Sequence, residues 1–109
     1  MMDETTFRRE ADRALHALKQ SLIDAEEDGG FEAEENGGVL NVVFDEPKGK
    51  FVFTPNTPVR QIWISALSTS FKLDWNGEAF ALGKTGEVLL VLTERLVREH
   101  TGDDSIQLR

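Results

Sequence analysis

Between residues 6 and 27, apolar side chains recur every three or four positions, with polar side chains between them. This spacing places the apolar residues along one face of an α-helix. Asp3, Thr5 or Thr6 can cap its start, and the Asp-Gly-Gly sequence at 28–30 can end it, because glycine readily adopts a left-handed conformation. The pattern predicts a helix over 6–27, with an apolar face made of Phe7, Ala11, Ala14, Leu15, Leu18 and Leu22.

The middle of the chain alternates short extended runs with turn residues. Asn36-Gly37-Gly38, Pro47-Lys48-Gly49 and Asn76-Gly77 separate such runs, and Asn-Gly between alternating segments is a strong hairpin signal. Links this brief favour antiparallel neighbours, because a parallel crossover needs about a dozen residues or more. We therefore predict six antiparallel strands, at residues 31–35, 39–44, 50–54, 61–66, 70–75 and 79–82.

Helical spacing returns after Thr85 and Gly86. Thr85 is expected to cap this second helix, Glu87 suits its first turn, and Gly102 marks its end. The order of one helix, six strands and a second helix predicts an α+β fold, a two-layer α/β sandwich with two helices packed on one face of an antiparallel sheet. No repeat or linker indicates a second domain, so we expect a single domain over 1–109. The apolar stripe of the second helix is predicted to consist of Val88, Leu89, Val91, Leu92 and Leu96.

The composition excludes several classes of protein. The 109 residues include no cysteine, which excludes disulfides, thiolate zinc sites and cysteine nucleophiles. The sequence also lacks a phosphate-binding glycine loop and a nucleophile elbow, so an ordinary enzyme finds little support. The longest apolar run, 88–92, has five residues, whereas a membrane-spanning helix needs about 20. The N-terminal residues show no apolar signal core, and we expect a cytoplasmic protein.

The net charge of −8 is concentrated in one part of the chain. The segment from Asp24 to Glu46 contains nine acids and no lysine or arginine, whereas the rest of the chain carries a net charge of +1. An acidic balance argues against nucleic acid or an anionic membrane as a partner. We call these nine residues the acidic stripe: Asp24, Glu26, Glu27, Asp28, Glu32, Glu34, Glu35, Asp45 and Glu46.

Part of the acidic stripe lies where a helix tolerates acids least. The C-terminal end of a helix is the negative end of its dipole, so each acid there costs about 0.3–1 kcal/mol at low salt. Asp24 and Asp28 also form a like-charge pair one turn apart. Glu32 and Glu34 project from one face of the first predicted strand, because side chains two residues apart point the same way. Either this is a solvated, solubilising surface, or it binds a ligand.

Carboxylate oxygens suit hard cations such as iron, manganese, calcium and magnesium. No nitrogen or sulfur donor is placed to complete a tight cage, because His16 and His100 lie in different predicted helices without ligand spacing and are expected at the surface. Metal binding is therefore expected to be weak, exposed and distributed over several sites. A basic protein surface is the other partner that this charge favours.

Trp63 is the second unusual feature. Ile62 and Ile64 share one face of their predicted strand, so Trp63 is expected on the outer face of the sheet among polar neighbours. Exposed tryptophans are enriched in protein-binding hot spots, although packing against a loop or a cross-strand side chain is the alternative. Trp75 alternates with apolar residues and is expected in the core. We call the outer set the tryptophan patch: Trp63, Gln61, Asn56 and Lys72.

In order and spacing, these features resemble the frataxin family, in its short bacterial CyaY type. The resemblance spans the chain from Phe7 to its last residues. It is carried by the acidic first helix and by Asn36-Gly37-Gly38-Val39-Leu40, Gln61-Ile62-Trp63-Ile64-Ser65, Asp74-Trp75 and Thr85-Gly86-Glu87.

The resemblance implies an α–β–α sandwich that binds iron weakly through surface carboxylates. It also implies interaction with the cysteine desulfurase and the scaffold protein of iron–sulfur cluster assembly, with no nucleic acid or membrane partner. The tryptophan patch matches the region that the family presents to these partners. The acids that match family positions are Asp24, Glu26, Asp28, Glu32 and Glu34, with Asp45 nearby and Glu27 as an additional acid.

The leading hypothesis is a non-enzymatic, iron-binding accessory protein of iron–sulfur cluster assembly, acting as iron donor, regulator or both. Two alternatives stay open. One is a purely electrostatic interaction module with incidental metal binding, and the other is a weak ferroxidase or iron-storage protein. A monomer is expected, with iron-induced oligomers as a further state. Without cysteines, the chain can assist cluster assembly but cannot hold a conventional cluster itself.

Overall fold

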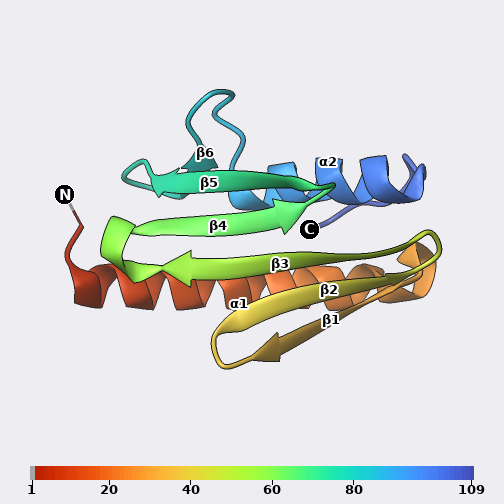
Figure 1. Ribbon diagram of the computed structural model, residues 1–109, viewed down its shortest axis with the longest axis horizontal. Coiled ribbons are helices and arrows are strands. Elements are labelled where there is room, and N and C mark those ends of the chain that lie inside the picture. Colours follow the sequence, from red (N-terminus) through yellow and green to blue (C-terminus); the bar gives the residue numbers. More distant parts are fainter. Residues whose placement is uncertain (1) are drawn as a thin grey trace.

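An antiparallel sheet of six strands forms one layer of the structure, and two helices cover one of its faces (Figure 1). The computed structural model describes residues 2–109, apart from the side chains of residues 27–29. This arrangement confirms the predicted α+β sandwich. Strands follow one another across the sheet in chain order. The elements are α1 (Glu4–Gly29), β1 (Phe31–Asn36), β2 (Val39–Asp45), β3 (Lys48–Asn56), the short 3₁₀ helix η1 (Thr57–Val59), β4 (Gln61–Ala66), β5 (Thr69–Trp75), β6 (Phe80–Leu82) and α2 (Leu89–Thr101).

Helix α1 is longer than the apolar pattern predicted, because both of its ends are capped beyond that pattern. The Thr6 backbone N–H donates to Asp3 Oδ1 at 2.7 Å, and this hydrogen bond holds the pKa of Asp3 below its usual value. At the other end, Gly30 has φ 66° and donates its N–H to the Glu26 carbonyl. Glycine meets this left-handed conformation without the steric cost that a side chain would add.

The core lies between the two layers and follows the alternation of the strands. Ile62 and Ile64 are fully buried against the helices, whereas Trp63 between them is exposed. From α1 the core receives Phe7, Leu15 and Leu22, which confirms the predicted helical face. Each fully buried side chain of this size contributes about 1.5–3 kcal/mol through removal from water.

The start of α2 differs from the prediction. The helix begins at Leu89, with Val88 as N-cap and no side-chain cap, instead of at Thr85. Thr85 Oγ1 instead accepts the Glu87 N–H at 3.2 Å. The Glu87 carbonyl accepts the Leu82 N–H, so this segment is bound to the sheet edge and cannot join the helix. Gly102 ends the helix as predicted.

Two further details concern the helices. Val91, assigned to the apolar stripe from spacing, is 52% exposed and points away from the core. Within residues 2–109, neither helix combines the length and the apolar character that crossing a lipid bilayer requires.

Candidate functional site

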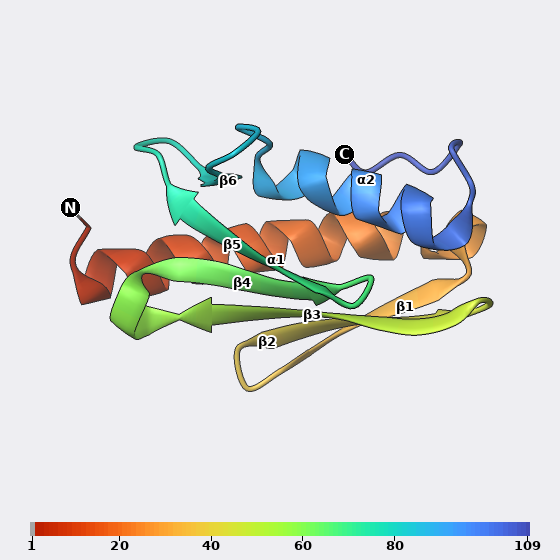
Figure 2. The ribbon, with the colours of Figure 1, turned by 45° about the horizontal axis from the view of Figure 1, so that its top comes forward.

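Three chain segments meet where α1 ends. The Gly30 turn leads directly from α1 into β1, and the Gly30 carbonyl accepts the Asp45 N–H at 3.2 Å from the end of β2. The Glu26 carboxylate reaches across from α1 and accepts the Ala33 N–H of β1 at 2.8 Å. Figure 2 shows this junction, with the end of α1 beside the start of β1. Part of the acidic stripe is therefore gathered at one end of the molecule by its own backbone.

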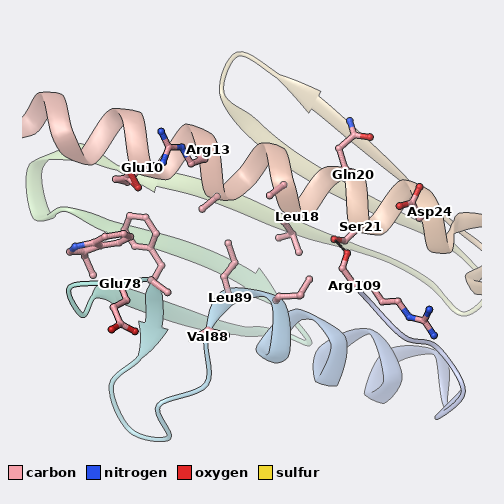
Figure 3. A pocket seen from close by; sticks show the side chains of 16 residues that line it. Glu10, Arg13, Leu18, Gln20, Ser21, Asp24, Glu78, Val88, Leu89 and Arg109 are labelled. Carbon is pink, nitrogen blue, oxygen red and sulfur yellow. Dashed lines mark hydrogen bonds and ion pairs between the residues drawn. The ribbon is translucent and has the colours of Figure 1, made fainter.

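The acids on α1 point in different directions. A helix turns by about 100° per residue, so Asp24 and Glu26 face nearly opposite sides. Glu26 faces β1, whereas Asp24 lies beside Ser21 and the last residues of the chain, including Arg109 (Figure 3). Glu27 and Asp28, also predicted metal ligands, have side chains outside the described part of the structure.

The strand acids lie on the outer face of the sheet, away from the helices. Phe31 is buried against α1, so the alternation turns Glu32 and Glu34 outward, and both are exposed. Glu32 and Glu34 therefore lie on the same strand as Ala33, which donates to Glu26. They point to the face of the sheet that α1 does not cover. Among the described side chains, Asp24 and Glu26 of α1 therefore do not share the outer face with Glu32 and Glu34.

Two lysines stand beside these acids and were missed by counting charges along the sequence. Asp45 is the register partner of Lys48, and the row that contains Glu32 and Val43 continues to Lys50 on β3. Both lysines are exposed. Both lysines come after the acidic stripe in the sequence, and the pairing of β3 with β2 places them beside its acids. Side chains alternate between the two faces along β3, and this alternation in the sequence could have placed both lysines on the outer face.

The described acids can bind a cation loosely, but they do not form a preformed metal cage. Among the side chains that the structure describes, no three His, Asp or Glu residues come close enough together to hold one metal ion. Within the same described set, none of the stripe's acids forms an ion pair. Carboxylates in this state fit hard cations through one or two oxygens at a time, with water completing the coordination.

The tryptophan patch lies on the outer face of β3, β4 and β5. Trp63 is 36% exposed, and its indole Nε1–H donates to Gln61 Oε1 at 2.8 Å. The Lys72 ammonium sits 4.8 Å from the centre of the indole ring, in the range of a cation–π contact. Asn56 is the register partner of Gln61 and shares this face. The predicted outward placement of Trp63 is confirmed, and polar partners hold its ring in one orientation.

Trp75 is not the core residue that its alternation predicted. It is half-buried, with its ring 5.1 Å from that of Phe80 in an edge contact. Together with Leu18 of α1 and Leu89 of α2, it lines an open, mostly apolar groove of about 610 Å³ between the helices (Figure 3). Because Trp75 lines this open groove, it is only half-buried.

His100 also differs from the expected surface position. Its Nε2 lies 2.7 Å from the Pro47 carbonyl, and its ring centre is 4.3 Å from that of Phe44. The ring fits there because Gly49 has no side chain, and a Cβ at that position would lie 2.3 Å from His100 Cε1. His100 thus joins the end of α2 to the β2–β3 turn beside Asp45. His16 is exposed, as predicted.

The chain matches known proteins along nearly its whole length. Residues 1–103 match the family described as a frataxin-like domain. Among solved structures, the frataxin from Psychromonas ingrahamii, studied for stability modulation within the CyaY protein family, has a TM-score of 0.76 at 19% sequence identity, over 97% of this chain and 97% of that one. Yeast frataxin has a TM-score of 0.71 at 23% identity, over 88% of this chain and 80% of its own. These two structures share the fold described above.

Proposed function

The chain belongs to the frataxin family and so has a role in iron–sulfur cluster assembly, and we propose that it acts there as a non-catalytic, iron-binding accessory protein. In this proposal it acts on the complex of the cysteine desulfurase with its scaffold protein, as iron donor or as regulator. Iron is its cargo and is held by surface carboxylates of the acidic stripe.

One observation carries this proposal: none of the stripe's described acids forms an ion pair within the described residues, and all of them except the half-buried Glu26 are exposed. At the end of α1 such acids oppose the helix dipole and lower stability. Acids that cost stability without a structural return are candidates for binding. A hard cation or a basic protein surface would relieve the repulsion among them, and both are partners that iron–sulfur cluster assembly offers.

Loose coordination agrees with a role in handing iron on. A cation held by one or two carboxylates exchanges quickly, whereas a closed cage would retain it. The same acids would attract a basic surface of the desulfurase with a rate and an affinity that fall as salt rises. In this proposal the tryptophan patch supplies the apolar contact of the assembled complex, because an exposed indole with polar neighbours is typical of a binding hot spot.

Neutralising the stripe tests the proposal directly. We expect a variant with Asp24→Asn, Glu26→Gln, Asp28→Asn, Glu32→Gln and Glu34→Gln to lose ferrous-iron binding in calorimetry and salt-sensitive binding to purified desulfurase. The matched control neutralises five acids outside the stripe, which leaves the same net charge: Glu4, Asp12, Glu78, Glu99 and Asp104. An unchanged iron titration in the stripe variant would refute the assignment of these residues to iron binding. Equal losses in both variants would show that net charge alone, and not the position of the acids, accounts for binding.

Replacing Trp63 by alanine separates partner binding from folding. We expect weaker binding to the desulfurase–scaffold complex with little change in Tm, because Trp63 lies on the outer face of the sheet and is 36% exposed. A large fall in Tm would show that the indole mainly stabilises the sheet.

A purely electrostatic interaction module is the second candidate, because no three-residue metal cluster is present among the described side chains. Calorimetry with ferrous iron and with calcium, each with and without the desulfurase, distinguishes the two. Specific iron uptake that the desulfurase alters supports the iron-binding role, whereas equal and negligible uptake of both cations supports the module. Aerobic oxidation of ferrous iron by the protein and by the stripe variant checks for ferroxidase activity.

A further inference from the structure

The two edge strands of the sheet, β1 and β6, differ in whether their outward-facing backbone groups have a neighbouring segment to pair with. Beyond β6, the following segment binds the edge, because the Leu82 N–H donates to the Glu87 carbonyl at 2.9 Å and Ala81 pairs with Val88. Beyond β1, Figures 1 and 2 show no further element among the described residues. The Glu26 carboxylate contacts this edge, where it accepts the Ala33 N–H at 2.8 Å.

The position of Glu26 identifies which backbone groups of β1 face outward. Strands in an antiparallel ladder point alternate backbone groups to either side, and the Ala33 N–H points to Glu26 instead of to β2. The backbone groups of Phe31 and Glu35 share this direction with those of Ala33. A strand edge with such groups is a template on which another extended chain can pair.

We propose that the β1 edge docks an extended, basic segment of a partner protein by strand pairing, and that Glu26 is its gate. In the free protein Glu26 occupies the Ala33 N–H and blocks the edge. The arriving strand supplies a backbone carbonyl to that N–H and displaces the carboxylate. This inference refines the proposed binding of a basic partner and rests on it, but it adds a defined docking strand and a residue that controls access.

Charge selects this occupant over a second copy of the chain. Glu32, Glu34 and Glu35 all lie on β1 and are exposed, so they would face the side chains of a paired strand. Lysine or arginine on that strand would form favourable cross-strand pairs. Two β1 strands paired antiparallel about Ala33 would set Glu32 against Glu34 twice, which is unfavourable. The acids therefore deter self-association and favour a basic strand.

The test uses a capped peptide of alternating lysine and threonine, about seven residues long to span β1. Its control is the same peptide with N-methyl groups on its central backbone nitrogens, which keep the charge and obstruct strand pairing. We expect the unmodified peptide to bind at least about tenfold more tightly and to shift the NMR signals of the Ala33 and Glu35 amides. Equal affinity of both peptides, or shifts confined to side chains, would show a charged face without strand docking.

Variants of Glu26 test the gate without relying on the peptide's charge. We expect Glu26→Ala to speed hydrogen exchange of the free Ala33 amide by about tenfold or more and to tighten peptide binding, because the blocking carboxylate is gone. Glu26→Gln keeps an acceptor oxygen and should stay close to the parent in exchange, which also serves if the alanine variant is poorly folded. Glu32→Ala, the matched loss of one charge, should weaken binding.

The outcomes distinguish this inference from the broader proposal. If Glu26→Ala weakens peptide binding as much as Glu32→Ala does, Glu26 is an attracting charge and the gate is refuted. If neither peptide binds while purified desulfurase still binds in a salt-dependent way, strand docking is refuted and the proposed function stands. Shifts of the β1 amides that depend on protein concentration alone would assign the edge to a second copy, against the proposal.

Discussion

The two helices end with the same backbone device but with opposite electrostatics. Gly30 (φ 66°) and Gly102 (φ 74°) both adopt a left-handed conformation. Their N–H groups donate hydrogen bonds to the carbonyls of Glu26 and Arg98, respectively. The last turn of α2 contains Arg98 and His100, which suit the negative end of the helix dipole. The last turn of α1 contains no basic residue.

The charges on α2 are used within the chain. Arg95 bridges Glu87 at 2.8 Å and Glu99 at 3.0 Å, and Arg98 bridges Glu94 at 3.3 Å. Hydrogen bonds from Arg95 and Thr85 hold the pKa of Glu87 below its usual value, and the bond to Glu87 raises that of Arg95. The described acids at the end of α1 have no such partner. The charges of α2 therefore serve the fold through ion pairs, whereas the described acids at the end of α1 form none, and this is why we propose a ligand for them.

The largest expected effect is at the end of α2. Gly49→Ala would place a Cβ 2.3 Å from His100 Cε1 and push the imidazole from the Pro47 carbonyl. We expect a loss of about 1–3 kcal/mol in the free energy of unfolding, as is typical of overpacking, measured by urea denaturation. Gly83→Ala is the control, because open space surrounds that position. Equal stability of the two variants would show that the end of α2 is not tightly packed.

Removing the central cation of α2 should have a smaller effect. Arg95→Met keeps much of the aliphatic volume but leaves Glu87 and Glu99 unpaired. Because the Arg95 side chain is 42% exposed, solvent screens these pairs, and we expect a loss of about 1 kcal/mol or less in urea denaturation. A neutral or stabilising result would mean that these ion pairs do not distinguish α2 from α1.

The lowered pKa of Glu87 predicts a matching dependence on pH. Its folded-state pKa lies below the usual 4.5, so the stabilisation is present above pH 4.5 and is lost as pH falls through the folded-state value. We expect the free energy of unfolding to fall less steeply in Arg95→Met than in the parent between about pH 5 and about pH 3. Parallel curves from urea denaturation at each pH would contradict this assignment.

The smallest expected effect has the opposite sign and lies at the end of α1. Asp24→Asn removes an acid from the negative end of the helix dipole, and we expect a gain of about 0.3–1 kcal/mol at low salt. The gain should shrink as salt rises to about 500 mM, because the field is screened. Glu94→Gln, which removes a paired acid on α2, should lower stability in the same urea assay. A loss in both variants would mean that Asp24 also has a structural partner.

Local patterns predicted most of the architecture. The strand at 61–66 has the predicted bounds, and Ile62, Trp63 and Ile64 take the predicted faces, because side-chain alternation is a property of the strand alone. The start of α2 was placed too early, since Thr85 has the local chemistry of a cap but a contact between Leu82 and Glu87 holds that segment on the sheet. Trp75 and His100 were misplaced for a related reason. Their burial depends on what other elements cover them.

Local patterns in the sequence were enough to predict the fold class, the glycine turns at the ends of the helices, the outward tryptophan and the amount of charge in the acidic stripe. These follow from periodicity, from backbone preferences and from composition, all of which act over a few residues. The surroundings of the acids, in contrast, depend on tertiary contacts. Strand pairing brings Lys48 and Lys50 into line with Asp45 and Glu32, and the turn at Gly30 brings Glu26 to the Ala33 N–H. A charge acts on its neighbours in space, and strand pairing and turns bring together neighbours that no local sequence pattern specifies.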